Sequence, residues 1–310
     1  MEKLHISVSP HIHGKKTTQG IMLDVIISLL PATIAGIVLF GIDALFVVAT
    51  CVISAVVCEL LFNIIVKKEQ TVSNLSSVVT GLLLALNLPA SIPLWQAAVG
   101  SAFAIIIVKC LFGGLGKNIV NPAITARVFM VIAFSSTVTS SVFPKGMDAT
   151  SGATPLVELD KGVSLNLIDL FLGNCGGAIG ETCALALIIG GIYLLVRKVI
   201  SWHIPVAFIG TAFLFTLCVE DFNFETALAW TLSGSLLIGA IFMATDYVTS
   251  PSTAKGKIIF GIGAGVITVL IRFWSSSYPE GVSFAILLMN ILNPYIDSLC
   301  TRKLFGGAKK

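Results

Sequence analysis

Residues 148–156 form a run of small and hydroxyl-bearing side chains that is well suited to covalent chemistry. Ser151-Gly152-Ala153 makes an accessible, deformable segment, and Pro155 disfavours helical geometry at the residue before it. Thr154 is therefore positioned to offer its hydroxyl to another molecule. Thr150 and Ser151 carry rival hydroxyls in the same run. The residues alone indicate either an acceptor hydroxyl or an ordinary turn.

A glycine-rich stretch, residues 113–117, fits nucleotide chemistry less well. A phosphate-binding loop of the Walker A type requires Gly and then Ser or Thr at the positions that Leu111 and Asn118 occupy here. We therefore expect no nucleotide site. The glycines are predicted to allow close backbone packing where the fifth apolar segment begins, and Asn121-Pro122 is typical of a helix start.

Single ionisable residues are the other candidates for chemistry. Asp246 lies in a break that contains Pro251, so it is either a functional carboxylate or an exposed residue at the membrane interface. Arg127 and Asp24 lie close to the ends of apolar segments, and we expect their side chains to snorkel to the surface. The cysteines form no C-x-x-C pair or cluster spacing. The sequence therefore predicts no metal site and no catalytic residue.

The composition excludes a single soluble domain. Of 310 residues, 56% are hydrophobic and 11% are charged, against about a quarter charged in average soluble domains. A mean hydropathy of +0.98 leaves too few polar residues to cover a surface in water, so the chain must lie in lipid. The net charge of +3 comes from short basic clusters without interleaved aromatic residues, which argues against nucleic-acid binding.

About ten apolar segments are long enough for transmembrane helices, which need about 20 apolar residues each. The polar residues 1–20 lead into the first segment without a signal-peptide cleavage site, so we expect that segment to be retained. The sequence thus predicts an all-α integral membrane protein. The predicted spans are roughly 22–41, 44–66, 72–88, 94–112, 122–141, 179–197, 204–219, 226–244, 257–274 and 282–299.

Lys and Arg gather in the connecting segments on one side of the membrane, which the positive-inside rule assigns to the cytoplasm. Both termini are then cytoplasmic and the long polar loop is extracytoplasmic. Five spans on each side of that loop are consistent with two inverted halves, a common plan in transporters. The predicted parts are a single membrane domain 1–310, its first five spans 1–141, the loop 142–178 and its last five spans 179–310.

Three separated stretches resemble the RnfD and NqrB family of membrane redox subunits. Ser9-Pro10-His11, leading to Ile21-Met22, resembles the opening segment of that family. Residues 113–118, running into Asn121-Pro122-Ala123, resemble its internal signature, and residues 243–251 resemble a third landmark. The stretches occur in the family's order, so the resemblance covers nearly the whole chain.

Residues 148–156 also resemble the flavinylation motif of this family, in which a flavin transferase joins the phosphate of FMN to the last Thr as a phosphoester. Position by position, the resemblance implies that Thr154 carries FMN and that Asp148 opens the motif, with Ser151-Gly152-Ala153 between them. The departure is Ala149, where Gly is commoner.

The resemblance implies an electron-transfer subunit of the Rnf complex, which couples electron transfer between reduced ferredoxin and NAD to Na⁺ or H⁺ movement across a bacterial or archaeal cell membrane. It implies further membrane and soluble subunits, including a flavin-bearing G subunit, and a flavin transferase during maturation. It also implies a noncovalent riboflavin, for which spacing assigns no residue. The sequence has no NAD fingerprint or cluster ligands, so we expect no complete active site in this chain.

Two other functions compete with this hypothesis. An NqrB-like quinone-reductase subunit would be longer before its first span, and the roughly 21 residues found there favour the Rnf branch. A cofactor-free transporter would use paired broken helices around a buried ion site, but the sequence shows one break near Asp246 and no matching partner. Flavin fluorescence that survives denaturation would separate these hypotheses.

Overall fold

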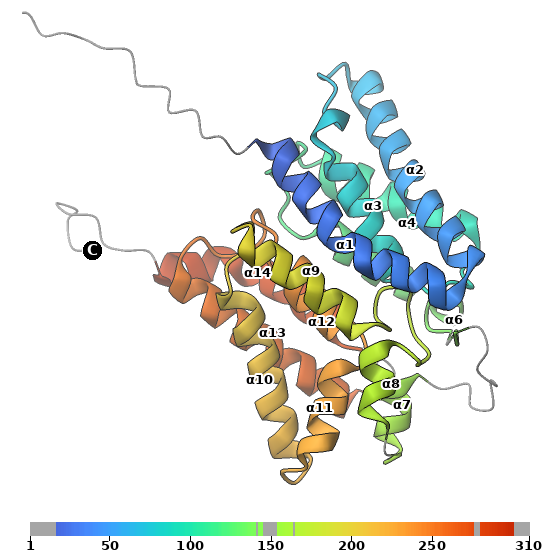
Figure 1. Cartoon of the computed structure of the whole chain (residues 1–310). Coiled ribbons are helices and arrows are strands. Elements are labelled where there is room, and N and C mark those ends of the chain that lie inside the picture. Colours follow the sequence, from blue (N-terminus) through green and yellow to red (C-terminus); the bar gives the residue numbers. More distant parts are fainter. Residues whose placement is uncertain (1–16, 141, 145–153, 164, 276–279, 301–310) are drawn as a thin grey trace, which may run out of the picture.

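The structure is a computed structural model whose described part is almost entirely helical (Figure 1). No strand occurs among the described residues, which confirms the prediction of an all-α protein. The described residues are 17–140, 142–144, 154–163, 165–275 and 280–300.

The first half of the chain contributes two long helices followed by shorter ones. The first begins where the Thr17 hydroxyl accepts a hydrogen bond from the backbone N–H of Gly20, and Gly41, with a φ of 80°, separates it from the second. The elements are α1 (Thr18–Phe40), α2 (Ile42–Val66), the 3-10 turn η1 (Val72–Asn74), α3 (Ser76–Leu86), α4 (Leu94–Ala102), the π-helical η2 (Phe103–Cys110), α5 (Pro122–Ala133) and α6 (Ser135–Val138).

The start of α5 follows the sequence prediction. Asn121 is its N-cap, and the side-chain oxygen accepts hydrogen bonds from the backbone N–H groups of Ala123 and Ile124. Pro122 is the first helical residue, where its missing N–H costs nothing. The predicted helix start is confirmed.

The second half contains a helix that breaks inside the molecule. The axis turns by 66° between α11 and the segment that continues from α12 into η3. Arg272 holds this break, because its guanidinium donates to the carbonyl oxygens of Trp230 and Ser233 at the end of α11. The elements are α7 (Pro155–Asp160), α8 (Leu167–Leu172), α9 (Ala184–Val196), α10 (His203–Val219), α11 (Phe224–Leu232), α12 (Leu236–Ile238), the π-helical η3 (Gly239–Met243), α13 (Ala254–Trp274) and α14 (Val282–Cys300).

The halves pack against each other through α1 on α9 and α5 on α14 (Figure 1). The first contact is very close, since a Cβ added to Gly190 would lie 2.1 Å from the carbonyl oxygen of Ser28. One hydrophobic core extends through both halves. Within each half the neighbours correspond, because α2 packs on α3 and α4 while α10 packs on α11 and α13.

The length and apolar composition of the helices confirm the prediction of an integral membrane protein. Large apolar side chains such as Ile53 and Ile65 point outward from α2 and are 61% and 77% exposed, as expected for a face in lipid. Each of the ten predicted spans contains an apolar helix. Within the described residues, four helices are long enough to cross a membrane, or five if the bent pair is one span, and the other apolar helices are shorter. The count of ten spans stays a prediction.

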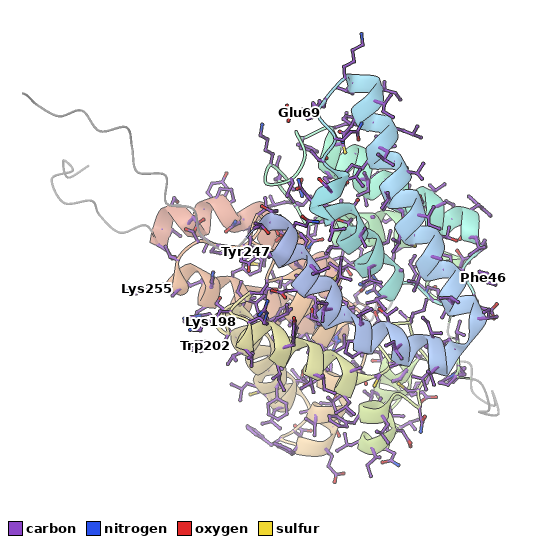
Figure 2. The ribbon with its side chains drawn as sticks, turned by 45° about the horizontal axis from the view of Figure 1, so that its top comes forward. Phe46, Glu69, Lys198, Trp202, Tyr247 and Lys255 are labelled. Carbon is purple, nitrogen blue, oxygen red and sulfur yellow. The ribbon has the colours of Figure 1, made fainter. Side chains whose placement is uncertain are left out.

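The bundle has two ends, named here the α1-start end and the Thr154 end. Figure 2 shows Lys198, Trp202 and Lys255 at the α1-start end and Phe46 on the opposite side. At the Thr154 end, α7 and α8 pack with α11 in a small separate core. The loop predicted as the flavin carrier thus contains two short helices that are anchored to the second half.

Candidate functional site

Thr154 is the N-cap of α7, with an extended backbone of φ −69° and ψ 156°. Pro155 is the first helical residue, so the predicted non-helical geometry of Thr154 is confirmed. Its carbonyl oxygen accepts the first hydrogen bonds of α7, but its side chain makes no capping hydrogen bond. The half-buried hydroxyl is therefore not needed by the helix. The other predicted motif residues, Asp148, Ser151, Gly152 and Ala153, lie outside the described residues.

Thr154 lines a narrow cleft, the Thr154 cleft, together with the carboxylates of Glu181 and Glu280. Its volume of about 20 Å³ holds about one water molecule and cannot hold a flavin ring. Both carboxylates pair with Arg127 of α5, whose Nη2 lies 2.8 Å from Oε1 of Glu181 and also contacts Glu280. We call these three residues the Arg127 cluster.

The Arg127 cluster joins three parts of the fold. Arg127 comes from the first half, whereas Glu181 and Glu280 come from the turns before α9 and α14. The guanidinium also donates to the side-chain oxygen of Asn87 at the end of α3. The Arg127 side chain is 4% exposed, so the expectation that it snorkels to the surface is wrong. Asp24, in contrast, lies near the surface and pairs with exposed Arg197.

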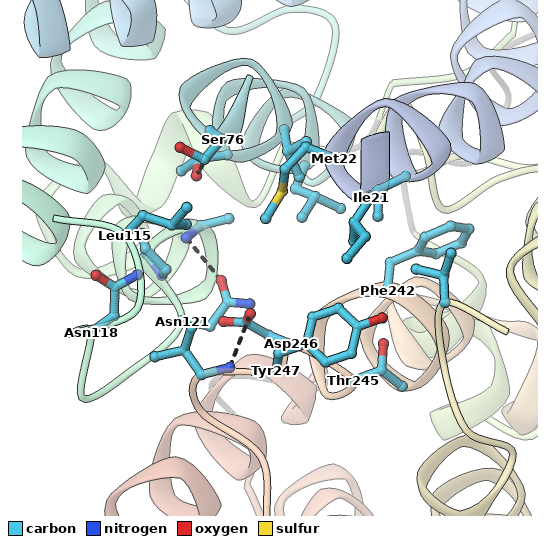
Figure 3. Close-up of a pocket in the computed structure, with 18 of the residues that line it drawn as sticks. Ile21, Met22, Ser76, Leu115, Asn118, Asn121, Phe242, Thr245, Asp246 and Tyr247 are labelled. Atoms are coloured by element: carbon cyan, nitrogen blue, oxygen red, sulfur yellow. Dashed lines mark hydrogen bonds between the residues drawn. The ribbon is translucent and has the colours of Figure 1, made fainter. Parts of the chain in front are cut away.

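A second candidate site is a cavity of about 240 Å³ near the α1-start end, here called the central cavity. Figure 3 shows Ile21 and Met22 of α1, Phe242 of η3, and the polar residues Asn121 and Asp246 around it. Mostly apolar walls with a few polar groups are typical of small-molecule sites, whose volumes begin at about 300 Å³. The cavity therefore approaches the size needed for a flat ring system.

Parts of all three family landmarks meet at the central cavity. Ile21 and Met22 end the opening segment, Asn118 and Asn121 belong to the internal signature, and Asp246 belongs to the third landmark. The side-chain oxygen of Asn118 is buried and has no hydrogen-bond partner among the described residues. A buried acceptor of this kind suits a ligand or water that donates an N–H or O–H group.

The glycines of the internal signature do not act as predicted. Gly114 and Gly116 have φ values of 92° and 86°, and a Cβ added to either would meet nothing within 4 Å. The prediction of close backbone packing is therefore wrong for these two residues. They are required for the left-handed backbone of the loop, which L-residues with a side chain rarely adopt. This loop brings Asn118 to the cavity wall.

Asp246 follows η3 and is partly buried at the cavity wall. Its carboxylate accepts a hydrogen bond from the Thr249 hydroxyl at 3.3 Å and a long one from the backbone N–H of Val248 at 3.5 Å. Just before it, the carbonyl oxygen of Met243 accepts from the Asn121 side chain, and the Met243 sulfur accepts from Asn87. The end of η3 thus contacts Asn121 of the central cavity and also Asn87, whose side-chain oxygen accepts from Arg127.

An ion pair in the first half separates the central cavity from another cavity. Lys109 of η2 donates to Glu59 of α2 and to the Ser76 hydroxyl of α3, both at 2.8 Å. Lys109 and Ser76 line the central cavity. Glu59 lines a different cavity of about 260 Å³, here called the surface cavity, together with exposed Lys68 and Glu69. The side chains of the pair are each 2% exposed.

Our sequence interpretation missed this ion pair, although a signal for it was present. Glu59 and Lys109 are single ionisable residues within otherwise apolar segments, where such residues are expected to be paired and functional. Only the fold shows that they face each other, because 50 positions separate them in the chain.

The NQR2, RnfD, RnfE family model matches residues 5–306. A protein from Acetobacterium woodii, named as the D subunit of a Na⁺-translocating ferredoxin:NAD⁺ oxidoreductase complex, is 46% identical over 99% of this chain and 96% of its own length. The D subunit of the proton-translocating complex of Clostridium ljungdahlii is 41% identical over 97% of this chain and 96% of its own. The D subunit of an ion-translocating oxidoreductase complex from Stutzerimonas stutzeri is 36% identical over 94% of this chain and 93% of its own.

Proposed function

Because the chain belongs to the NQR2, RnfD, RnfE family, we propose that it is a membrane electron-transfer subunit of an ion-translocating ferredoxin:NAD⁺ oxidoreductase complex. The names of relatives that align along nearly their full length support this proposal. They favour the ferredoxin:NAD⁺ reaction over quinone reduction. The relatives differ between Na⁺ and H⁺, and the same proposal applies to either ion.

Within this complex the chain carries FMN on Thr154 through a phosphoester. The observation that supports this assignment is the extended backbone of Thr154 before Pro155, with a hydroxyl that caps no helix. When bound, FMN supplies a site that accepts and releases electrons. The Thr154 cleft is too small for the ring, so the ring lies outside the cleft and the chain contributes the anchor.

Peptide mass spectrometry of the protein co-expressed with its flavin transferase tests this assignment directly. FMN mass on Thr154 supports it, and FMN mass on Thr150 or Ser151 would move the attachment site. The absence of any covalent flavin, with fluorescence lost on denaturation, would instead favour a cofactor-free transporter.

A second flavin, noncovalent riboflavin, occupies the central cavity in this proposal. The convergence of three family landmarks on one cavity supports it. Riboflavin would bring a donor N–H group for the buried oxygen of Asn118 and an apolar ring for the walls. Its place at the opposite end from Thr154 would let electrons be passed along the molecule.

The chain crosses the membrane ten times in this proposal, as two inverted halves with cytoplasmic termini and an extracytoplasmic flavin loop. The corresponding helix neighbours in the two halves support this arrangement, as do Lys198 and Lys255 at the α1-start end. Reporter fusions at residue 150 and after residue 310 should give opposite sides. The same side for both would overturn the topology.

The remaining parts of the reaction belong to partners. Soluble and membrane subunits, among them a flavin-bearing G subunit, supply electrons and the NAD⁺ site, and a flavin transferase acts during maturation. Co-purification of these subunits with a tagged chain would test the assembly.

A further inference from the structure

The Lys109–Glu59 ion pair is costly where it lies. Both side chains are almost fully buried among apolar helices, and each charge loses its hydration there. Replacing such a pair by apolar residues of similar size is often neutral or stabilising. Stability alone therefore does not explain why two charges are buried at this position, and a function that uses the charges does.

The position of the pair suggests that function. Lys109 and Ser76 line the central cavity, whereas Glu59 and Thr71 line the surface cavity. The two cavities thus approach the same ion pair from opposite sides. Exposed Lys68 and Glu69 line the surface cavity as well, which places it at the protein surface.

Hydrogen bonds connect the two cavities without interruption. The Thr71 hydroxyl donates to Oε1 of Glu59 at 2.6 Å, and Lys109 donates to Oε2 of the same carboxylate at 2.8 Å. Asn63 donates to Thr71 at 3.1 Å, which fixes the hydroxyl so that it points to the carboxylate. Each heavy-atom distance is within the range of a good hydrogen bond, as proton transfer requires.

We propose that Thr71, Glu59 and Lys109 form a proton relay from the surface cavity to a ligand in the central cavity whose reduced form binds a proton. This inference rests on the proposed function, because that function places riboflavin in the central cavity and supplies its electrons from reduced ferredoxin. The relay supplies the proton that ring reduction consumes and is separate from the translocated ion.

The proton balance closes over one cycle. Riboflavin held in the central cavity would accept two electrons that derive from ferredoxin, and the Lys109 ammonium would donate one proton to it. The neutral Lys109 amine then takes a proton from Glu59. Glu59 receives that proton from the Thr71 hydroxyl, which in turn takes one from a hydronium ion in the surface cavity. One proton has moved from the surface cavity to the ring, and both side chains have regained their starting charges.

The charged groups around the relay fit proton movement from the surface cavity to the central cavity. Lys68 and Glu69 face the surface cavity with opposite charges, so neither sign of charge dominates its mouth. In the central cavity, Asp246 is the other charged residue of the wall, and its carboxylate is already hydrogen-bonded within its own turn. Lys109 is therefore the cation that can donate a proton to the ligand.

The test uses the full-length chain, expressed without a flavin transferase and loaded with riboflavin as the probe. Photoreduction with EDTA as electron donor, followed through the absorbance changes of the flavin on reduction and on protonation of the reduced ring, records ring reduction and proton uptake by the ring separately. In the wild-type chain, proton uptake should keep pace with ring reduction. Glu59→Gln should slow uptake at least tenfold while riboflavin binding stays unchanged, and formate, a small weak acid, should restore the rate.

Two further variants keep the test decisive if Glu59→Gln does not fold. Thr71→Val removes only the hydroxyl and should slow uptake, and the double variant Glu59→Leu with Lys109→Met buries no charge and should slow it at least as much. Asp24→Asn is the matched control, because it removes a carboxylate from an ion pair at the same end that lines neither cavity. Its uptake rate should equal that of the wild type.

Uptake rates within twofold of the wild type in the folded relay variants would overturn the relay. A wild-type chain that binds no riboflavin would also overturn it, because the relay would have no acceptor. Neither result touches the assignment of FMN to Thr154, which the peptide masses decide separately.

Discussion

The Lys109–Glu59 pair and the Arg127 cluster both bury a cation with carboxylates, yet they are built differently. The pair lies within the first half, joins one cation to one carboxylate and separates two cavities of about 240 and 260 Å³. The Arg127 cluster joins the two halves, shares one cation between Glu181 and Glu280, and borders a cleft of about 20 Å³. The Lys109–Glu59 pair has a cavity on each side that could hold a proton donor or acceptor. The cleft beside the Arg127 cluster is too small for a flavin ring, so the cluster serves to hold the two halves together.

The largest effect should come from the residue beside the Arg127 cluster. Thr154→Ala should abolish covalent flavin while the fold persists, because the hydroxyl is lost and caps no helix. In-gel fluorescence after denaturation measures the covalently bound flavin. Thr150→Ala is the matched control and should keep the flavin, and Asp148→Ala should lower labelling through weaker transferase recognition. Fluorescence remaining on the Thr154 variant would place the covalent cofactor elsewhere, away from the Arg127 cluster.

Removing Arg127 should have the next largest effect. Arg127→Met leaves two carboxylates facing each other where the halves meet, and breaking a buried pair in this way costs about 3–5 kcal/mol. Thermal unfolding in detergent should show a large drop in Tm. Adding Glu181→Gln to this variant should recover part of the loss, since one buried negative charge is removed. An unchanged Tm for Arg127→Met would show that the cluster does not hold the halves together.

The Lys109–Glu59 pair should respond differently to single and double changes. Glu59→Leu alone leaves a buried, unpaired ammonium and should also cost about 3–5 kcal/mol. Adding Lys109→Met removes that charge, so the double variant should return to within about 1 kcal/mol of the wild type. The same unfolding measurement applies. A double variant as unstable as the single one would mean that the pair is structural, and the contrast with the Arg127 cluster would disappear.

The smallest effect should come from the ion pair near the surface. Asp24→Asn breaks the 3.2 Å contact with Arg197, whose side chain is 57% exposed and remains hydrated without a partner. The change in Tm should be smaller than for any buried variant. If Asp24→Asn lowered the Tm as much as Arg127→Met, burial would not explain why the ion pairs differ in their contribution to stability.

Local rules predicted those parts of the structure that depend on neighbours in sequence. The extended backbone of Thr154 follows from Pro155, and the start of α5 follows from Asn121-Pro122, so both were predictable. The positions of the apolar helices follow in the same way from apolar runs.

Features that depend on partners distant in sequence were not predictable. Arg127 lies near one end of an apolar run, and its burial depends on carboxylates 54 and 153 positions further along the chain. The break expected near Asp246 is present, since residues 244–253 are not helical, but the break after α11, where Arg272 binds the freed carbonyl groups, was not expected. The role of Gly114 and Gly116 depends on loop conformation, which spacing does not reveal.

The docking of α7 limits how far a cofactor on Thr154 can travel. Leu156 and Leu159 are 2% and 5% exposed and pack with Trp230 of α11, so the tether begins at a fixed point. A flavin joined there swings on an arc set by the phosphoester and the ribityl chain alone. For the FMN proposed on Thr154, any electron donor or acceptor must come within that short reach, and the exchange of electrons would be confined to partners that dock beside α7.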